Sequence, residues 1–277
     1  MCDRLEKVLI NGVSILENSG YSIFYITCLS DELKELIRNF LVPICHGVKK
    51  SEKYQNSKSY SYENTIKEFI KRYDNKTTKQ KKGLIGEFLF HVLLCNFKKE
   101  FTTNTPFFNL EERNVKKGFD AILNKTGTTE LWIAEVKSGE LNKGKQNELA
   151  KNLLNTAKRD LVKRLPDSFS LWQNAINGAE VAISEARSEK EAFINLLTEM
   201  SDKSSNNEIK SSAVNVVLVG TVFTGLQNKV FESEISKKYQ ELSQEHIFKN
   251  IYLFVIQKEL YQKVYNFLKE EGKESDE

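Results

Sequence analysis

The feature that most limits how this chain can fold is an apolar run, LWIAEVKS (131–138), interrupted at alternate positions by one acidic and one basic residue. Its length and composition are those of a strand in the middle of a sheet. Side chains alternate faces along a strand, so Glu135 and Lys137 point one way and Ala134 and Val136 the other. Burying a carboxylate and an ammonium without partners is costly, so neighbouring elements must supply compensating groups.

The rest of the chain has the pattern of a mixed α/β protein. Segments rich in β-branched and aromatic residues predict strands at 22–28, 117–123, 131–138, 213–223 and 251–257. Apolar residues at helical spacing predict helices at 31–42, 63–73, 82–95, 145–165, 178–200 and 258–271. Polar, serine-containing stretches at 49–62 and 201–212 are expected to be loops. A short turn containing Gly127 joins strands 117–123 and 131–138, which predicts a hairpin.

The length of 277 residues fits one large domain, or one domain with a smaller one attached. We expect residues 1–75 to form a small N-terminal α/β extension and residues 76–277 to form the main domain. No apolar run approaches the roughly 18 residues of a membrane helix. The start, MCDRLEKVLINGV, does not have the pattern of a secretory signal, so we expect a cytoplasmic protein.

Three carboxylates can converge beside Lys137. Glu87 lies on the predicted helix 82–95, Asp120 on the first strand of the hairpin and Glu135 on the second. Carboxylate oxygens are the ligands that Mg²⁺ prefers, and Mn²⁺ can substitute for it. Such a metal can activate a water for phosphodiester hydrolysis, while Lys137 stabilises the developing charge. An ExK pair on a strand is by itself usually a surface ion pair. The catalytic interpretation therefore depends on the whole D-x(14)-ExK hairpin with its upstream Gly-Glu helix.

Basic residues surround these acidic motifs, although the net charge is only +3. Lysines cluster at 76–82, 98–99 and 116–117 and recur along 143–164. The alternative interpretation is that they form solvated helix faces and loops. Because the clusters bracket the acidic motifs, we predict that some contact nucleic-acid phosphates. The residues predicted for this role are Lys145, Lys151, Lys158 and Arg159.

The segments GLIGEFLFHVLL, GFDAIL and WIAEVKSGE resemble, in this order, the motifs of the PD-(D/E)XK nuclease superfamily, whose core is an αβββαβ unit. The resemblance covers about residues 79–260, and Phe119 replaces the proline that often precedes the aspartate. In size and motifs the chain is also similar to the HamA family, the nuclease subunits of the Hachiman anti-phage system, whose domain is shared with AbpA. By resemblance, Glu135 and Lys137 are the catalytic pair, Asp120 a metal ligand and Glu87 a supporting carboxylate.

This resemblance implies a fold with a restriction-endonuclease-like core and a Mg²⁺-dependent DNase activity in anti-phage defence. It further implies a partner, a superfamily 2 helicase (HamB-like), that forms a heterodimer with the nuclease and restrains it. Two alternatives stay open: a stand-alone restriction or repair endonuclease, and an inactive nucleic-acid-binding regulator of a helicase. The intact set of four residues argues against the inactive regulator. Residues 1–75 are expected either to dock the helicase or to complete the nuclease core.

Overall fold

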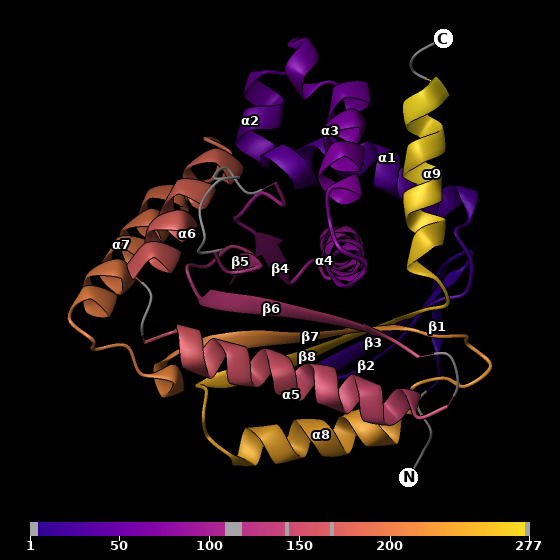
Figure 1. Ribbon diagram of the computed structural model, residues 1–277. Coiled ribbons are helices and arrows are strands. Elements are labelled where there is room, and N and C mark those ends of the chain that lie inside the picture. Colours follow the sequence, from indigo (N-terminus) through magenta and orange to yellow (C-terminus); the bar gives the residue numbers. More distant parts are fainter. Residues whose placement is uncertain (1–4, 109–117, 142–143, 167–168, 275–277) are drawn as a thin grey trace.

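One mixed sheet of eight strands, in the order β1-β2-β3-β8-β7-β6-β5-β4, runs through the whole molecule. The computed structural model describes residues 5–108, 118–141, 144–166 and 169–274. Helices cover both faces of the sheet (Figure 1). The structure confirms the mixed α/β class predicted from the sequence.

The centre of the sheet is parallel and its two sides are antiparallel. The parallel strands are β3 (Tyr21–Ile26), β8 (Asn250–Lys258), β7 (Asn215–Phe223) and β6 (Leu131–Glu140). On one side the sheet ends with β2 (Val13–Glu17) and β1 (Lys7–Ile10), and on the other with β5 (Ala121–Lys125) and β4 (Phe101–Thr103). All nine residues of β7 are buried, as expected for a parallel strand covered on both faces.

The helices form two groups, one for each face of the sheet (Figure 1). The first face is covered by α1 (Asp31–His46), α3 (Tyr62–Asp74), α4 (Thr78–Phe97) and α9 (Tyr261–Glu274), with α2 (Val48–Lys53) beside α1. The second core contains α5 (Gln146–Arg164), α6 (Phe169–Ala182), α7 (Lys190–Ser205) and α8 (Glu232–Gln244). Ser30, Ser61 and Thr77 cap the helices that follow them, because each side chain accepts a backbone N–H of the first turn.

The hairpin predicted around Gly127 is present, since β5 and β6 pair antiparallel. Its first strand begins at Ala121, later than predicted, and Lys117 lies outside the described residues. The predicted loop 49–62 is partly wrong, because it contains the short helix α2 and a 3₁₀ turn at Lys58–Tyr60. The predicted loop 201–212 begins too early, because α7 continues to Ser205. Short strands β1, β2 and β4 were not predicted.

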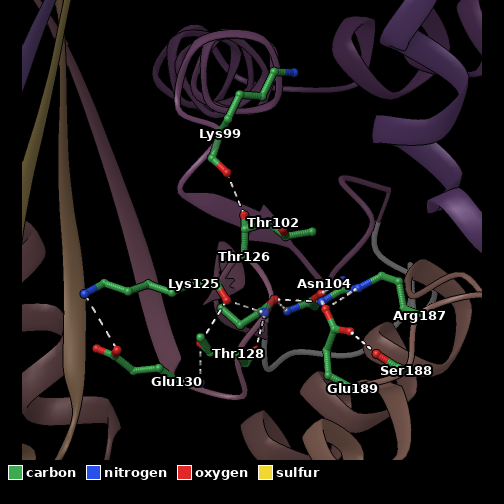
Figure 2. A network of polar contacts seen from close by, with 11 residues as sticks. Lys99, Thr102, Asn104, Lys125, Thr126, Thr128, Glu130, Arg187, Ser188 and Glu189 are labelled. Carbon is green, nitrogen blue, oxygen red and sulfur yellow. Dashed lines mark hydrogen bonds and ion pairs between the residues drawn. The ribbon is translucent and has the colours of Figure 1, made fainter.

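The predicted helix 178–200 is wrong as a single element: α6 ends at Ala182 and α7 begins at Lys190. Arg187 lies in the connection and donates to Asn104 Oδ1 at 2.8 Å and to Asn124 Oδ1 at 3.1 Å. Its guanidinium also pairs with Glu189 at 2.8 Å (Figure 2). These bonds tie the α6–α7 connection to β5 and to Asn104, the residue after β4. They require a loop where the local sequence favours a helix.

Residues from the first quarter of the chain share the sheet and the core with the rest. β3 pairs with β8 along six residues. Ile37, Ile66 and Phe69 are fully buried in the same core as Phe88 of α4. Arg38 of α1 also forms an ion pair with Glu271 of α9, at 2.8 Å. Residues 5–75 therefore share one sheet and one hydrophobic core with β8, α4 and α9.

Candidate active site

The strands β5 and β6 separate at Asp120. Their pairing runs from Asn124–Leu131 to Ala121–Ala134, whereas β6 stays paired with β7 as far as Glu140. Asp120 lies directly before β5, and its Oδ2 accepts the N–H of Val136 at 2.7 Å. The carboxylate thus takes a backbone N–H of β6 at the point where the ladder between the two strands ends. This fork places Asp120 beside the second half of β6.

Glu135 and Lys137 both point from β6 toward α5. Glu135 is only 1% exposed, and Lys137 Nζ lies 2.6 Å from its Oε1. Lys137 Nζ also lies 3.0 Å from Asp160 Oδ2 of α5. Arg164, in the last turn of α5, donates through Nη1 to both carboxylate oxygens of Glu135, at 3.0 and 2.9 Å. Two cations therefore compensate the charge of one buried carboxylate.

Burial controls the electrostatics of this cluster. It raises the pKa of Glu135, the charge of Asp120 raises it further, and together they bring it to about 7 despite the opposing effect of Arg164 and Lys137. Burial alone would lower the pKa of Lys137, but the carboxylates of Glu135 and Asp120 raise it above its ordinary value. The site therefore favours a positive charge beside two carboxylates, one of which is costly to ionise.

Glu87 comes from the other face of β6. Its neighbour Gly86 packs against Ser138 and Thr221, which places α4 across the second half of β6. Glu87 itself is half-buried. Among the described residues, no three His, Cys, Asp or Glu side chains are close enough to form a metal site. The structure thus brings together Asp120, Glu135 and Lys137, and it does not bring Glu87 into one group with the two carboxylates.

His91 lies one turn after Glu87 and is completely buried. Its ring packs edge-on against Phe107, with centroids 5.9 Å apart, and the backbone of Asp120 lies beside it. Burial lowers its pKa to about 4. The ring is therefore neutral at ordinary pH and supports the segment that carries Asp120.

Two of the four predicted nucleic-acid contacts, Lys151 and Lys158, lie on the side of α5 that faces α8. Lys151 pairs with Glu234 at 2.6 Å and Lys158 with Glu245 at 2.7 Å. Lys145 is exposed, 3.8 Å from Glu148. Arg159 is exposed at a shallow groove of about 570 Å³. The groove is lined by Asn155, Lys158, Arg159, Val162, Lys163, Glu241 and Ile247. Lys116, Lys117 and Lys143 lie outside the described residues.

Asp160 and Arg164 were not singled out from the sequence. Their spacing of four residues places them on one side of α5, one turn apart. α5 begins the connection between the parallel neighbours β6 and β7, and it packs against both strands. A sequence signal for Asp160 and Arg164 was therefore present. They are an acid and a base one turn apart on the helix that follows the ExK strand, and this helix could pack on the face that Glu135 and Lys137 share.

A sheet covered by helices on both faces, with a carboxylate–lysine pair on a central strand, is consistent with the α/β core of a nuclease. The family model for HamA matches residues 3–271, and the chain belongs to this family of Hachiman defence proteins. Its role accordingly lies in a defence system. A search of curated proteins gives no match. No helix of the described chain combines the length and apolar character needed to cross a membrane.

Proposed function

We propose that this protein is a metal-dependent deoxyribonuclease of the PD-(D/E)XK type that hydrolyses phosphodiester bonds as the effector of its defence system. The observation that carries the proposal is the meeting of Asp120, Glu135 and Lys137 where β5 and β6 separate. Two carboxylates with one lysine are the groups needed to hold a hard cation and to stabilise charge on a phosphate.

A divalent cation fits the chemistry of these residues. Glu135 is buried near the second carboxylate of Asp120, and two carboxylates close together are a donor set that suits a hard divalent cation. Mg²⁺ prefers carboxylate oxygen and water and usually keeps several waters in its shell. Asp120 and Glu135 would hold it, and Mn²⁺ would substitute. Glu87 approaches from the other face of β6, so it would support the site only indirectly. When bound, the cation would polarise the phosphoryl oxygen and lower the pKa of a water molecule.

The chain's own groups then have separate roles. Lys137 carries a compact positive charge that can approach a single phosphate oxygen. Its ion pair with Asp160 at 3.0 Å, together with Glu135 at 2.6 Å, fixes where that charge lies before DNA arrives. A charge that is already in place costs no reorganisation when negative charge develops in the transition state. Lys137 should therefore affect the rate of cleavage more than the binding of DNA.

The test is cleavage of plasmid DNA with and without Mg²⁺, by the wild type and by Glu135→Ala and Lys137→Ala. Each variant should lose on the order of 100- to 1000-fold in rate and keep a cooperative thermal melt. Glu130→Ala, directly before the same hairpin strand, is the matched control and should cut normally. A well-folded Glu135→Ala protein that cuts at the wild-type rate would remove the assignment.

The second part of the proposal is that a superfamily 2 helicase forms a heterodimer with this protein and restrains its activity. Membership of the HamA family supports it. The same cleavage assay, repeated with a HamB-like superfamily 2 helicase added, tests it. Restraint by the helicase predicts slower cleavage in the complex until damaged or phage DNA is added. Equal cleavage in both states would favour a stand-alone endonuclease. Absence of cleavage under every condition would favour an inactive nucleic-acid-binding regulator.

A further inference from the structure

The guanidinium of Arg164 joins three parts of the candidate active site. Nη1 donates to both oxygens of Glu135 on β6, and Nη2 donates to the carbonyl oxygen of Gly118 at 2.6 Å. Gly118 lies two residues before Asp120, in the segment that leads into β5. Because Arg164 is in the last turn of α5, one side chain connects this helix, the strand and the segment that carries Asp120.

These contacts use most of the hydrogen-bond acceptor capacity of the Glu135 carboxylate. Its Oε1 accepts from Lys137 and Arg164, its Oε2 accepts from Arg164, and the side chain is closed to solvent. A Mg²⁺ ion would need to lie about 2.1 Å from one of these oxygens. At that position it would lie within a few ångströms of the guanidinium, where like charges repel strongly in a site of low dielectric. The cation and the guanidinium therefore compete for the carboxylate of Glu135.

Of the two cations, Arg164 is the one that can leave. The side chains of Lys137 and Arg164 are about equally exposed, at 25% and 26%, so what separates them is their anchorage. Lys137 extends from β6 beside Glu135 and is held by Asp160 on its other side. Arg164, in contrast, reaches Glu135 from the last turn of α5. A guanidinium is also more weakly hydrated than an ammonium and forms bidentate pairs with carboxylates, which suits it to a site without metal.

We propose that Arg164 is a positioning residue that holds the metal-free site closed by competing with the divalent cation for Glu135. This inference rests on the proposed function, because it requires a metal at Asp120 and Glu135. In addition, a metal ion can enter the site only when the side chain of Arg164 is released from Glu135. Any event that draws Arg164 away from Glu135 would thereby raise the affinity of the site for metal.

The test is calorimetric titration of Mn²⁺ into the full chain and into Arg164→Ala and Arg164→Gln, in the absence of DNA. Glutamine keeps hydrogen-bonding capacity without the charge, so it preserves the test if the alanine variant does not fold. Both variants should bind Mn²⁺ more tightly than the wild type, by a factor on the order of 10. Lys163→Ala removes another cation from the last turn of α5, one that is exposed, and should bind as the wild type does.

Thermal melts give a second readout that does not depend on cleavage. Without metal, loss of Arg164 leaves Glu135 buried with less compensation, so the melting temperature should fall. Added Mn²⁺ should raise it more in the variants than in the wild type. If both variants bind Mn²⁺ as tightly as the wild type or more weakly, Arg164 does not compete with the cation for Glu135. The proposal that Asp120 and Glu135 bind a metal is not affected by that result. No Mn²⁺ binding by the wild type or either variant overturns both.

Discussion

Gly86 of α4 and Ser138 of β6 are in such close contact that no side chain fits between them. A β-carbon at position 86 would lie 1.9 Å from Ser138 Oγ and 3.1 Å from Thr221 Cβ. The glycine therefore lets the helix approach the face of β6 opposite to Glu135 and Lys137. Glu87 is the next residue, so its distance from the fork of β5 and β6 depends on this contact.

Gly86→Ala should push α4 away from β6 and destabilise the protein by about 1–3 kcal/mol, the usual cost of overpacking. Gly83→Ala is the matched control on the same helix, because a β-carbon there has no atom within 4 Å. That change should instead stabilise the helix by about 0.5–1 kcal/mol. Chemical denaturation measures both changes. Equal stability of the two variants would show that the contact at Gly86 is not rigid.

Asp120→Asn should weaken the binding of Mg²⁺ or Mn²⁺ measured by calorimetry, because it removes one carboxylate charge from the proposed site. The asparagine oxygen can still accept the N–H of Val136, so the fold should keep its stability. Asp120→Ala should weaken metal binding too, and should also cost about 1–3 kcal/mol by leaving that N–H unpaired. Undiminished binding in both variants would exclude Asp120 as a ligand.

Neutralising the four basic residues Lys145, Lys151, Lys158 and Arg159 should lower the salt dependence of DNA binding. Removing one phosphate contact reduces the slope of log K against log salt by about 0.9. Lys151 and Lys158 must leave Glu234 and Glu245 to make such contacts, whereas Arg159 is already exposed. Lys237→Gln on α8 provides an exposed control. An unchanged slope in the fourfold variant would favour the interpretation of a solvated, ion-paired helix face.

Deletion of residues 1–75 should give a chain that is insoluble or does not unfold cooperatively. The deletion removes β3, the partner of β8, and exposes a core that includes Phe88. Circular dichroism and a thermal melt of the truncated chain measure this. A folded, soluble nuclease that no longer co-purifies with the helicase would contradict this expectation and support a separate docking extension.

His91 should make the protein less stable as the pH falls from about 6.5 to about 4. Its ring takes up a proton near pH 6.5 in the unfolded chain, but burial lowers the pKa to about 4 in the folded chain. The unfolded state therefore binds more protons in this window, which costs at most roughly 3 kcal/mol. His91→Leu should unfold with a shallower dependence on pH. Burial also lowers the pKa of His46 to about 4, so part of the dependence should persist.

The alternating pattern of one strand predicted most of the site. Glu135 and Lys137 could be placed on one face because a strand repeats every two residues, and Asp120 could be placed opposite them because a short turn joins the strands. Arg164 was not identified, since its role depends on how α5 rotates against the sheet. That rotation is determined by the packing of Ala150, Leu154 and Ala157 and of their neighbours in the second core.

The parts of the fold that were missed depend on tertiary contacts. The interval 183–189 has a helical composition, and the bonds of Arg187 to Asn104 and Asn124 are made between segments far apart in sequence. β4 has only three residues, and β1 is largely exposed. Such short strands are stabilised by their partners in the sheet, so the local sequence carries little signal for them.

The order of the strands has a consequence for how the chain is synthesised. β8 lies between β3 and β7, so the N-terminal hairpin has no place in the sheet until Asn250–Lys258 has left the ribosome. Contacts between such distant segments form late in folding, because a long loop must be closed first. Early fragments of a nascent chain would thus contain Glu135 and Lys137 on a strand without the completed sheet around it. A cell that makes this protein is exposed to the completed sheet around the site only after β8 has been translated.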